Sequence, residues 1–174
     1  MPNQDHLFLL SLSQQELDRR ITTESIASLD FSAYDFVQNQ LRYPIPTQMR
    51  GLVFRVPVDF SGCTFPPDFA IQNVQFLAPA NFARCTFKGL FTLNNVHPFL
   101  PSLVECNFEG LVQIENLPMG TAVPLTMRDG RFAGAVTIIQ NQLTGIILAG
   151  SKFDGAVEVA ATVGGIADFA NVED

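Results

Sequence analysis

Hydrophobic and polar positions follow one another in short runs that return about every 22 residues along this chain. The clearest marker is a Phe that follows a small residue and a polar or charged residue, and it stands at five places: Phe65, Phe87, Phe108, Phe132 and Phe153. The intervals between them are 22, 21, 24 and 21 residues. Self-similarity at such a period indicates a solenoid in which each repeat forms one coil.

Each marker Phe is followed by an alternating run. The positions four and six places later are apolar in every repeat, as in Val112 and Ile114, whereas the residue between them is small or polar, as in Gln113. Strict alternation predicts a β-strand with one buried face. One strand per coil is therefore expected at 69–71, 91–93, 112–114, 136–138 and 157–159.

A second apolar position lies five residues before each marker Phe, which adds an inward residue on the preceding side of the coil. Two further Phe residues, Phe36 and Phe169, fit the same pattern near the ends of the chain. The predicted core ladder is Phe36, Phe60, Phe65, Phe82, Phe87, Leu103, Phe108, Met127, Phe132, Leu148, Phe153 and Phe169.

Small residues accompany the ladder at fixed offsets. The position two before each marker Phe is predicted to be a stacked inward corner, and it holds Cys63, Cys85, Cys106, Gly130 and Ser151. The position two after it is expected to form a tight turn, because Gly tolerates positive φ and Pro fixes φ at negative values. It holds Pro67, Gly89, Gly110, Gly134 and Gly155.

The repeat extends over most of the chain. Residues 29–36 align position by position with residues 58–65, and residues 167–169 begin another coil that is unfinished at Asp174. We expect six to seven coils over residues 29–174. The preceding residues 1–28 are expected to hold a short capping helix, since Ser13 and Glu16 have capping-box spacing before Leu17 and Ile21.

The two segments VDFSGCTF at 58–65 and ANFARCTF at 80–87 carry a family resemblance. Their small-x-Phe steps and five-residue spacing are similar to those of pentapeptide-repeat proteins, over roughly residues 29–174. The resemblance implies an all-β fold, a right-handed quadrilateral β-helix with the central Phe or Leu and the small residue inside. The present coils are longer than twenty residues and hold only two clean pentapeptides each, so part of every coil is expected to be irregular.

Composition narrows the function classes. The chain has 174 residues, 47% of them hydrophobic, which suits one folded domain. A charged fraction of 16% and a net charge of −7 argue against direct nucleic-acid binding. No apolar run approaches the roughly 18 residues needed to cross a bilayer, and residues 1–12 lack the features of a secretory signal. A cytoplasmic location is the resulting expectation.

Residues that bear reactive groups form no recognisable catalytic, cofactor or metal motif. The three Cys are spaced by one coil, which favours stacked core positions over zinc ligands or a disulfide. His97 precedes Pro98 in an insertion and is expected in a loop, and His6 is the only other His. We therefore predict no enzyme activity, no cofactor and no metal.

A carbohydrate-active β-helix is a remote alternative, because such enzymes place carboxylates on one outer face. Glu105, Glu109 and Glu115 lie near one coil. Glycoside hydrolysis needs two carboxylates at a defined separation. The sequence favours another interpretation, in which these carboxylates are outward-facing groups in contact with solvent. The chain has no Trp, which argues against an aromatic sugar-binding cleft.

The leading interpretation is a non-catalytic binding or scaffold protein with an unknown protein partner, since solenoids present outer residues at regular intervals. The resemblance adds an alternative, an acidic mimic of duplex DNA that binds DNA gyrase. It also suggests a homodimer through the C-terminal coil. Segments 41–50 and 96–101 interrupt the repeat and are the candidate binding loops, although the sequence favours tolerated insertions as their explanation.

Overall fold

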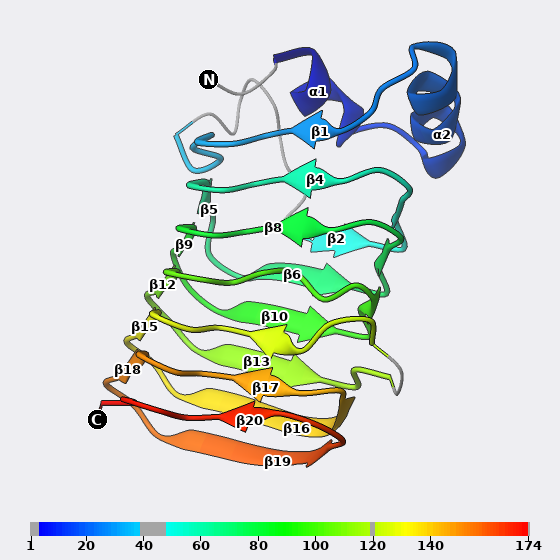
Figure 1. Ribbon diagram of the computed structural model, residues 1–174. Helices are drawn as coiled ribbons and strands as arrows, with labels where there is room; N and C mark the ends of the chain where they lie inside the picture. The colour runs from blue at the N-terminus through cyan, green and yellow to red at the C-terminus, as the bar shows by residue number, and fades with distance from the viewer. Residues whose placement is uncertain (1–3, 39–47, 119–120, 174) are drawn as a thin grey trace.

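The computed structural model describes residues 4–38, 48–118 and 121–173. These residues form a β-solenoid of about five coils with two short helices at its N-terminal end (Figure 1). Strands of successive coils pair in parallel, so the chain advances by one strand spacing, about 4.8 Å, with each turn. The predicted mostly-β solenoid is confirmed, and its strands lie on four faces, here named A to D.

Face A begins each coil and is assembled from two three-stranded ladders joined through Ser102. Isolated bridges connect Ser102 to Asn81 on one side and to Thr126 on the other. The strands are β1 (Leu29–Asp30), β4 (Val58–Asp59), β8 (Ala80–Asn81), β14 (Leu125–Thr126), β17 (Ile146–Ile147) and β20 (Ala167–Asp168).

Face B carries the marker Phe residues. Its strands are β5 (Thr64–Phe65), β9 (Thr86–Phe87), β12 (Asn107–Phe108), β15 (Arg131–Phe132) and β18 (Lys152–Phe153). Isolated bridges extend this ladder at both ends, from Asp35 to Thr64 and from Lys152 to Glu173. The structure therefore has about five coils with single bridges beyond them, fewer than the six to seven coils expected from the sequence.

Face C contains the longest strands and the largest sheet. The alternating runs predicted from the sequence all lie on it, which confirms one such strand per coil. Its strands are β2 (Gln48–Arg50), β6 (Phe69–Gln72), β10 (Phe91–Asn94), β13 (Val112–Glu115), β16 (Val136–Leu143) and β19 (Val157–Val163). The pairing of β16 with β19 shifts register between Ile139 and Asn141.

Face D closes the first coils and was not predicted. It contains β3 (Val53–Phe54), β7 (Gln75–Phe76) and β11 (His97–Pro98). The expectation that His97 lies in a loop is wrong, because β11 pairs with β7 in register, His97 opposite Gln75. The physical reason is burial: Val96 and Leu100 on either side are 0% and 4% exposed and anchor the segment to the core.

The core is a stack of aromatic rings along the solenoid axis. Phe87, Phe108 and Phe132 are fully buried, and their ring centroids are 4.9 and 4.8 Å apart with interplanar angles of 6° and 9°. Of the predicted ladder, every residue from Phe36 to Phe153 is buried. Phe169 is instead 46% exposed, because no further described coil covers it.

The glycines after the marker Phe residues have a different role from the one expected. Positive φ does not occur at Gly89, Gly110, Gly134 or Gly155. They stack backbone against backbone: a Cβ on Gly110 would lie 2.6 Å from the carbonyl carbon of Gly89, and one on Gly155 would lie 2.7 Å from that of Gly134. Close approach of successive coils, rather than turn conformation, requires Gly here.

Two helices, α1 (Gln4–Leu9) and α2 (Gln14–Thr23), cover the N-terminal end of the solenoid (Figure 1). Leu7 and Leu9 of α1 and Leu17 and Ile21 of α2 belong to the same hydrophobic cluster as the Phe ladder. The sequence predicted α2 as a cap but did not predict α1. Its short apolar segment, Leu7–Leu10, was too brief to show a helical period.

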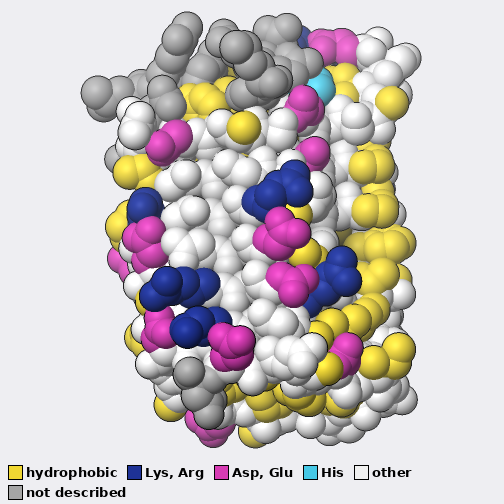
Figure 2. Space-filling model, turned by 60° about the vertical axis from the view of Figure 1, so that its left-hand side comes forward, with side chains coloured by type: hydrophobic (Ala, Val, Ile, Leu, Met, Phe, Trp, Pro, Cys, Tyr) yellow, Lys and Arg dark blue, Asp and Glu magenta, His cyan; other side chains and the backbone are white. Residues whose placement is uncertain are grey.

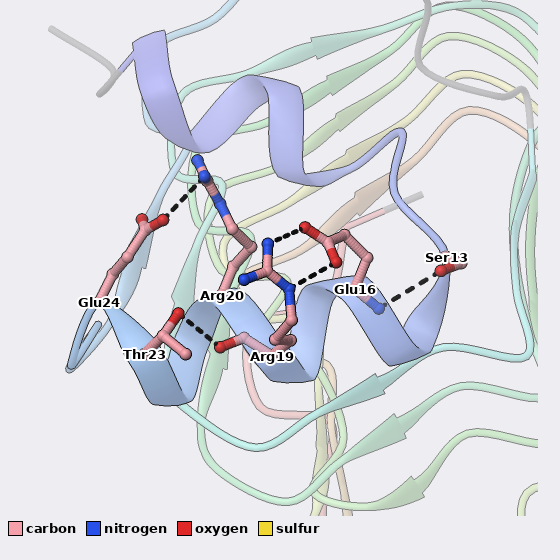
Figure 3. A network of polar contacts seen from close by, with 6 residues as sticks. All are labelled: Ser13, Glu16, Arg19, Arg20, Thr23 and Glu24. Atoms are coloured by element: carbon pink, nitrogen blue, oxygen red, sulfur yellow. Dashed lines mark hydrogen bonds and ion pairs between the residues drawn. The ribbon is translucent and has the colours of Figure 1, made fainter.

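Side chains of α2 hold the helix together on its outer side (Figure 3). Ser13 caps the helix, its hydroxyl oxygen accepting from the Glu16 backbone N–H at 3.3 Å. The Arg19 guanidinium pairs with the Glu16 carboxylate, and Arg20 pairs with Glu24 at 2.8 Å. Such i,i+3 and i,i+4 pairs bring opposite charges together on one side of the helix.

Two polar side chains of the cap bond to the first strands of the solenoid. The Gln14 amide makes a pair of hydrogen bonds with the Val53 backbone: Nε2 donates to the carbonyl oxygen at 3.0 Å, and Oε1 accepts from the N–H at 2.7 Å. His6 Nδ1 accepts from the Asp30 backbone N–H at 2.9 Å. These side chains satisfy backbone groups of β3 and β1, which are the first described strands of faces D and A.

Candidate binding surfaces

Charged side chains on the outer side of face B are paired between successive coils. Lys88 Nζ lies 2.8 Å from Glu109 Oε1, and Arg131 lies 3.0 Å from Asp154 Oδ2. Blue and magenta side chains accordingly alternate over this region in Figure 2. Exposed pairs of this kind contribute little stability, but they leave the surface with mixed charge rather than a continuous negative stripe.

The three carboxylates considered for sugar cleavage occupy separate parts of one coil. Glu105 is in the turn before β12, Glu109 follows β12 and is paired with Lys88, and Glu115 ends β13 on face C. Glu115 lines a small depression of about 50 Å³ with Gln113 and Thr137. Neither of the other two carboxylates lines that depression.

The three cysteines are buried, and their thiols bond to backbone. The Sγ atoms of Cys63, Cys85 and Cys106 each donate to a carbonyl oxygen of the preceding coil at 3.0 Å. Ser151, in the same column, donates its hydroxyl to the Met127 carbonyl oxygen at 2.7 Å. Burial raises the pKa of Cys63 to about 12 and also raises the pKa of Cys85.

A thiolate is the form of cysteine that binds metals and attacks electrophiles. The raised pKa values therefore favour neutral, structural thiols in this column. Within the ranges that the structure describes, no three His, Cys, Asp or Glu side chains are grouped to hold a metal ion. His6 lies in the cap and His97 on face D, in different parts of the molecule.

The C-terminal coil presents apolar side chains to solvent. Val157 and Val159 of β19 are 43% and 39% exposed, although the equivalent residues of β16, Val136 and Ile138, are buried. Ile166 and Phe169 on either side of β20 are also exposed. These positions face the core in earlier coils, so this end is an uncovered cross-section of the hydrophobic core.

Two cavities lie along face A and share Pro79. One, of about 380 Å³, is lined by Ser28 to Asp30, Pro57 to Asp59, Pro79 and Asn81. The other, of about 330 Å³, is lined by Pro79, Ala80, Phe99 to Ser102, Val123, Pro124 and Thr126. Neither cavity was predicted from the sequence, although the recurrence of Pro immediately before Val58, Ala80 and Leu125 was a usable signal.

The two candidate loops from the sequence have different outcomes. Most of segment 41–50 lies outside the described residues, and its last part forms β2. Segment 96–101 is not a simple exposed loop, since it contains β11 and buried Leu100. Its residues Phe99 to Pro101 nevertheless line the second cavity.

The remaining findings concern membrane spans and similarity to known proteins. Neither helix among the described residues has the length and apolar character needed to span a membrane. Comparison of the sequence with protein-family models, with curated proteins and with solved structures finds no significant match.

Proposed function

We propose that this chain is a non-catalytic binding or scaffold protein that associates through its surfaces. The observation that carries the proposal is the C-terminal coil, where Val157, Val159 and Phe169 are between 39% and 46% exposed. Burying apolar surface is favourable by about 25 cal/mol per Å². A partner that covers this end would bury the same kind of apolar surface that one coil buries against the next.

The partner proposed for this end is a second copy of the chain. The outer edge of β19 presents backbone groups over Val157–Val163, and an exposed edge strand readily pairs with another strand. A two-fold axis through the end of the solenoid would place β19 antiparallel to its counterpart. The same apolar residues would then be buried on both copies, as an isologous contact requires.

The test is the molecular mass of the protein in solution, measured by light scattering across a range of concentrations. A dimer at micromolar concentration that becomes a monomer in Val159→Asp supports the proposal. Gln113→Asp is the matched control, because Gln113 occupies the middle of exposed face C and should leave the dimer intact. A monomeric parent protein at high concentration would exclude the second copy as the partner.

We further propose that the chain is an irregular pentapeptide-repeat protein with a right-handed solenoid. The support is the register of faces A and B: each coil places one five-residue unit on each of these faces, as in 80–84 and 85–89. In both units the small first residue and the Phe are buried, as Ala80 and Phe82 show. An experimental structure that showed the sense of the winding would test this.

Mimicry of duplex DNA at gyrase is the alternative function. The net charge of −7 and the rod-like form favour it, whereas the ion-paired ladder of Lys88, Glu109, Arg131 and Asp154 weighs against it. Mimicry predicts inhibition of gyrase supercoiling that weakens with salt. A binding protein of another kind predicts no effect at either low or high salt.

A further inference from the structure

The two cavities on face A are neighbours that share Pro79, and we call the pair the axial groove. It crosses five rungs of the ladder: β1, β4, β8, the Ser102 bridge and β14. Four strand spacings amount to roughly 20 Å. In Figure 2 this face has turned to the right, where hydrophobic side chains form a nearly continuous vertical band.

The floor of the groove offers a ligand little backbone hydrogen bonding. Proline has no N–H to donate. The carbonyl oxygens of Pro57 and Pro79 already accept from the N–H groups of Leu29 and Val58, at 2.9 and 3.1 Å. A ligand lying along the groove would therefore be recognised by side-chain contacts rather than as an added β-strand.

One half of the groove is apolar. Its cavity of about 330 Å³ is lined by Phe99, Leu100, Val123 and prolines, with the small side chains of Ala80 and Ser102 between them. That volume lies at the lower end of the range of about 300–1,000 Å³ found for ligand pockets. It suits a few aliphatic or aromatic side chains of a partner.

The other half is acidic. Asp30 and Asp59 each use Oδ1 to accept a backbone N–H two residues on, from Ser32 at 2.9 Å and from Ser61 at 2.8 Å. Hydrogen bonding from Ser32 lowers the pKa of Asp30, which keeps this carboxyl ionised. In the part of the chain that the structure describes, neither carboxylate forms an ion pair with Lys or Arg.

We propose that the axial groove binds an extended peptide segment of a partner protein, basic where it meets Asp30 and Asp59 and apolar where it meets Phe99 and Val123. An extended chain advances about 3.3 Å per residue, so the groove accommodates about six residues. The complementarity of charge at one end and of apolar surface at the other selects this ligand. The inference rests on the proposed binding function and adds a second surface to it.

The test begins with selection of random displayed hexapeptides on the full-length protein. Expected are peptides with one or two Lys or Arg toward one end and apolar residues toward the other. Synthetic copies of the enriched peptides are then titrated by fluorescence anisotropy. Ser102→Arg, which fills the groove and adds a positive charge, should weaken their binding more than tenfold. Gln113→Arg makes the same charge change on face C and should leave the affinity unchanged.

A second variant tests the acidic end without filling the groove. Asp30→Asn with Asp59→Asn keeps both Oδ1 acceptors and removes both charges. Exposed ion pairs contribute modestly, so binding of the basic peptides should weaken roughly five- to tenfold. Its salt dependence should fall at the same time. Melting midpoints of all variants show whether each remains folded.

Enrichment of peptides without basic residues, or equal binding to the parent and to Ser102→Arg, would overturn the inference. Binding lost equally in Gln113→Arg would also overturn it, since the contact would then be non-specific attraction. The mass of the same variants separates this result from the proposed self-association. If the protein is a dimer but binds no peptide, only the inference about the groove fails. If it binds peptide as a monomer, only the proposed dimer fails.

Discussion

At the scale of single residues, the stacked Phe rings make the sharpest stability prediction. Phe108 is fully buried between Phe87 and Phe132. Phe108→Ala should lower the free energy of unfolding by about 3–5 kcal/mol, because it removes apolar contacts and leaves a cavity. Denaturant unfolding followed by circular dichroism measures the change.

Phe8→Ala is the matched control for that experiment. Phe8 lies on α1 and is 50% exposed. Its truncation should therefore cost much less, about 1 kcal/mol or below. Equal losses for the two variants would mean that burial in the stack does not determine the stability.

The glycine column gives a second prediction. A Cβ on Gly134 would lie 2.5 Å from the Gly110 carbonyl oxygen, so Gly134→Ala must push two coils apart. We expect a loss of about 1–3 kcal/mol, as is typical for overpacking. The control is Gly164→Ala, where the nearest atom is the Leu143 carbonyl oxygen at 3.7 Å. Equal losses of stability for the two variants in thermal unfolding would contradict the stacking of the glycines.

The cysteine column predicts a pH dependence. Burial raises the pKa of Cys63 from 9.0 to about 12 in the folded protein. A thiol with a raised folded pKa contributes stability that is complete below the unfolded value and is lost as pH rises toward the folded value. Stability should therefore fall between about pH 9 and pH 12, and Cys63→Ala should fall less steeply. Urea titrations at pH 7, 9 and 10.5 measure the difference.

The sequence alone was sufficient to place the recurring residues in the core. A large Phe and a small corner residue recur at fixed offsets, so Phe87 and Cys85 were placed in the core from spacing alone. The role of Gly110 was not readable, because positive φ and close backbone approach both select Gly. Only the neighbouring coil, which the sequence does not locate, distinguishes the two.

At the scale of elements, the cap should contribute through its polar side chains as well as its buried ones. Gln14→Ala removes both hydrogen bonds to the Val53 backbone. Leaving such groups unpaired costs about 1–3 kcal/mol when they are shielded from water. The neighbouring Gln15 is exposed, and Gln15→Ala should have little effect. Comparison of the melting temperatures of the two variants tests whether the hydrogen bonds from Gln14 to the edge of β3 stabilise the fold.

The elements that sequence pattern did not reveal are the ones that tertiary contacts create. Face D strands such as β11 contain two residues, too few for an alternating pattern, and β11 includes Pro98. The axial groove is lined by residues from five successive rungs of face A. Equivalent positions of these rungs hold different residue types, such as Pro79 and Leu100. The C-terminal coil was expected to be exposed, and its residues Val157, Val159 and Phe169 are exposed in the structure.

At the scale of the whole molecule, local stability should vary along the solenoid axis. Coils contact mainly their neighbours, so an outer coil can open without the rest. Hydrogen exchange at pH 7 should show amides of β19 and β20 exchanging at least tenfold faster than those of β9 and β12. Uniform protection in a protein shown to be monomeric would mean that the solenoid opens only as a single unit.

The two ends of the described solenoid differ in how their strand edges are covered. Side chains of α1 and α2 occupy the edge groups of the first coil, whereas the last coil leaves its strand edge and apolar residues uncovered. In the dimer proposed above, the two open ends would face each other and the two helix-covered ends would point outward. Such an isologous contact would close at two copies instead of continuing into a fibre.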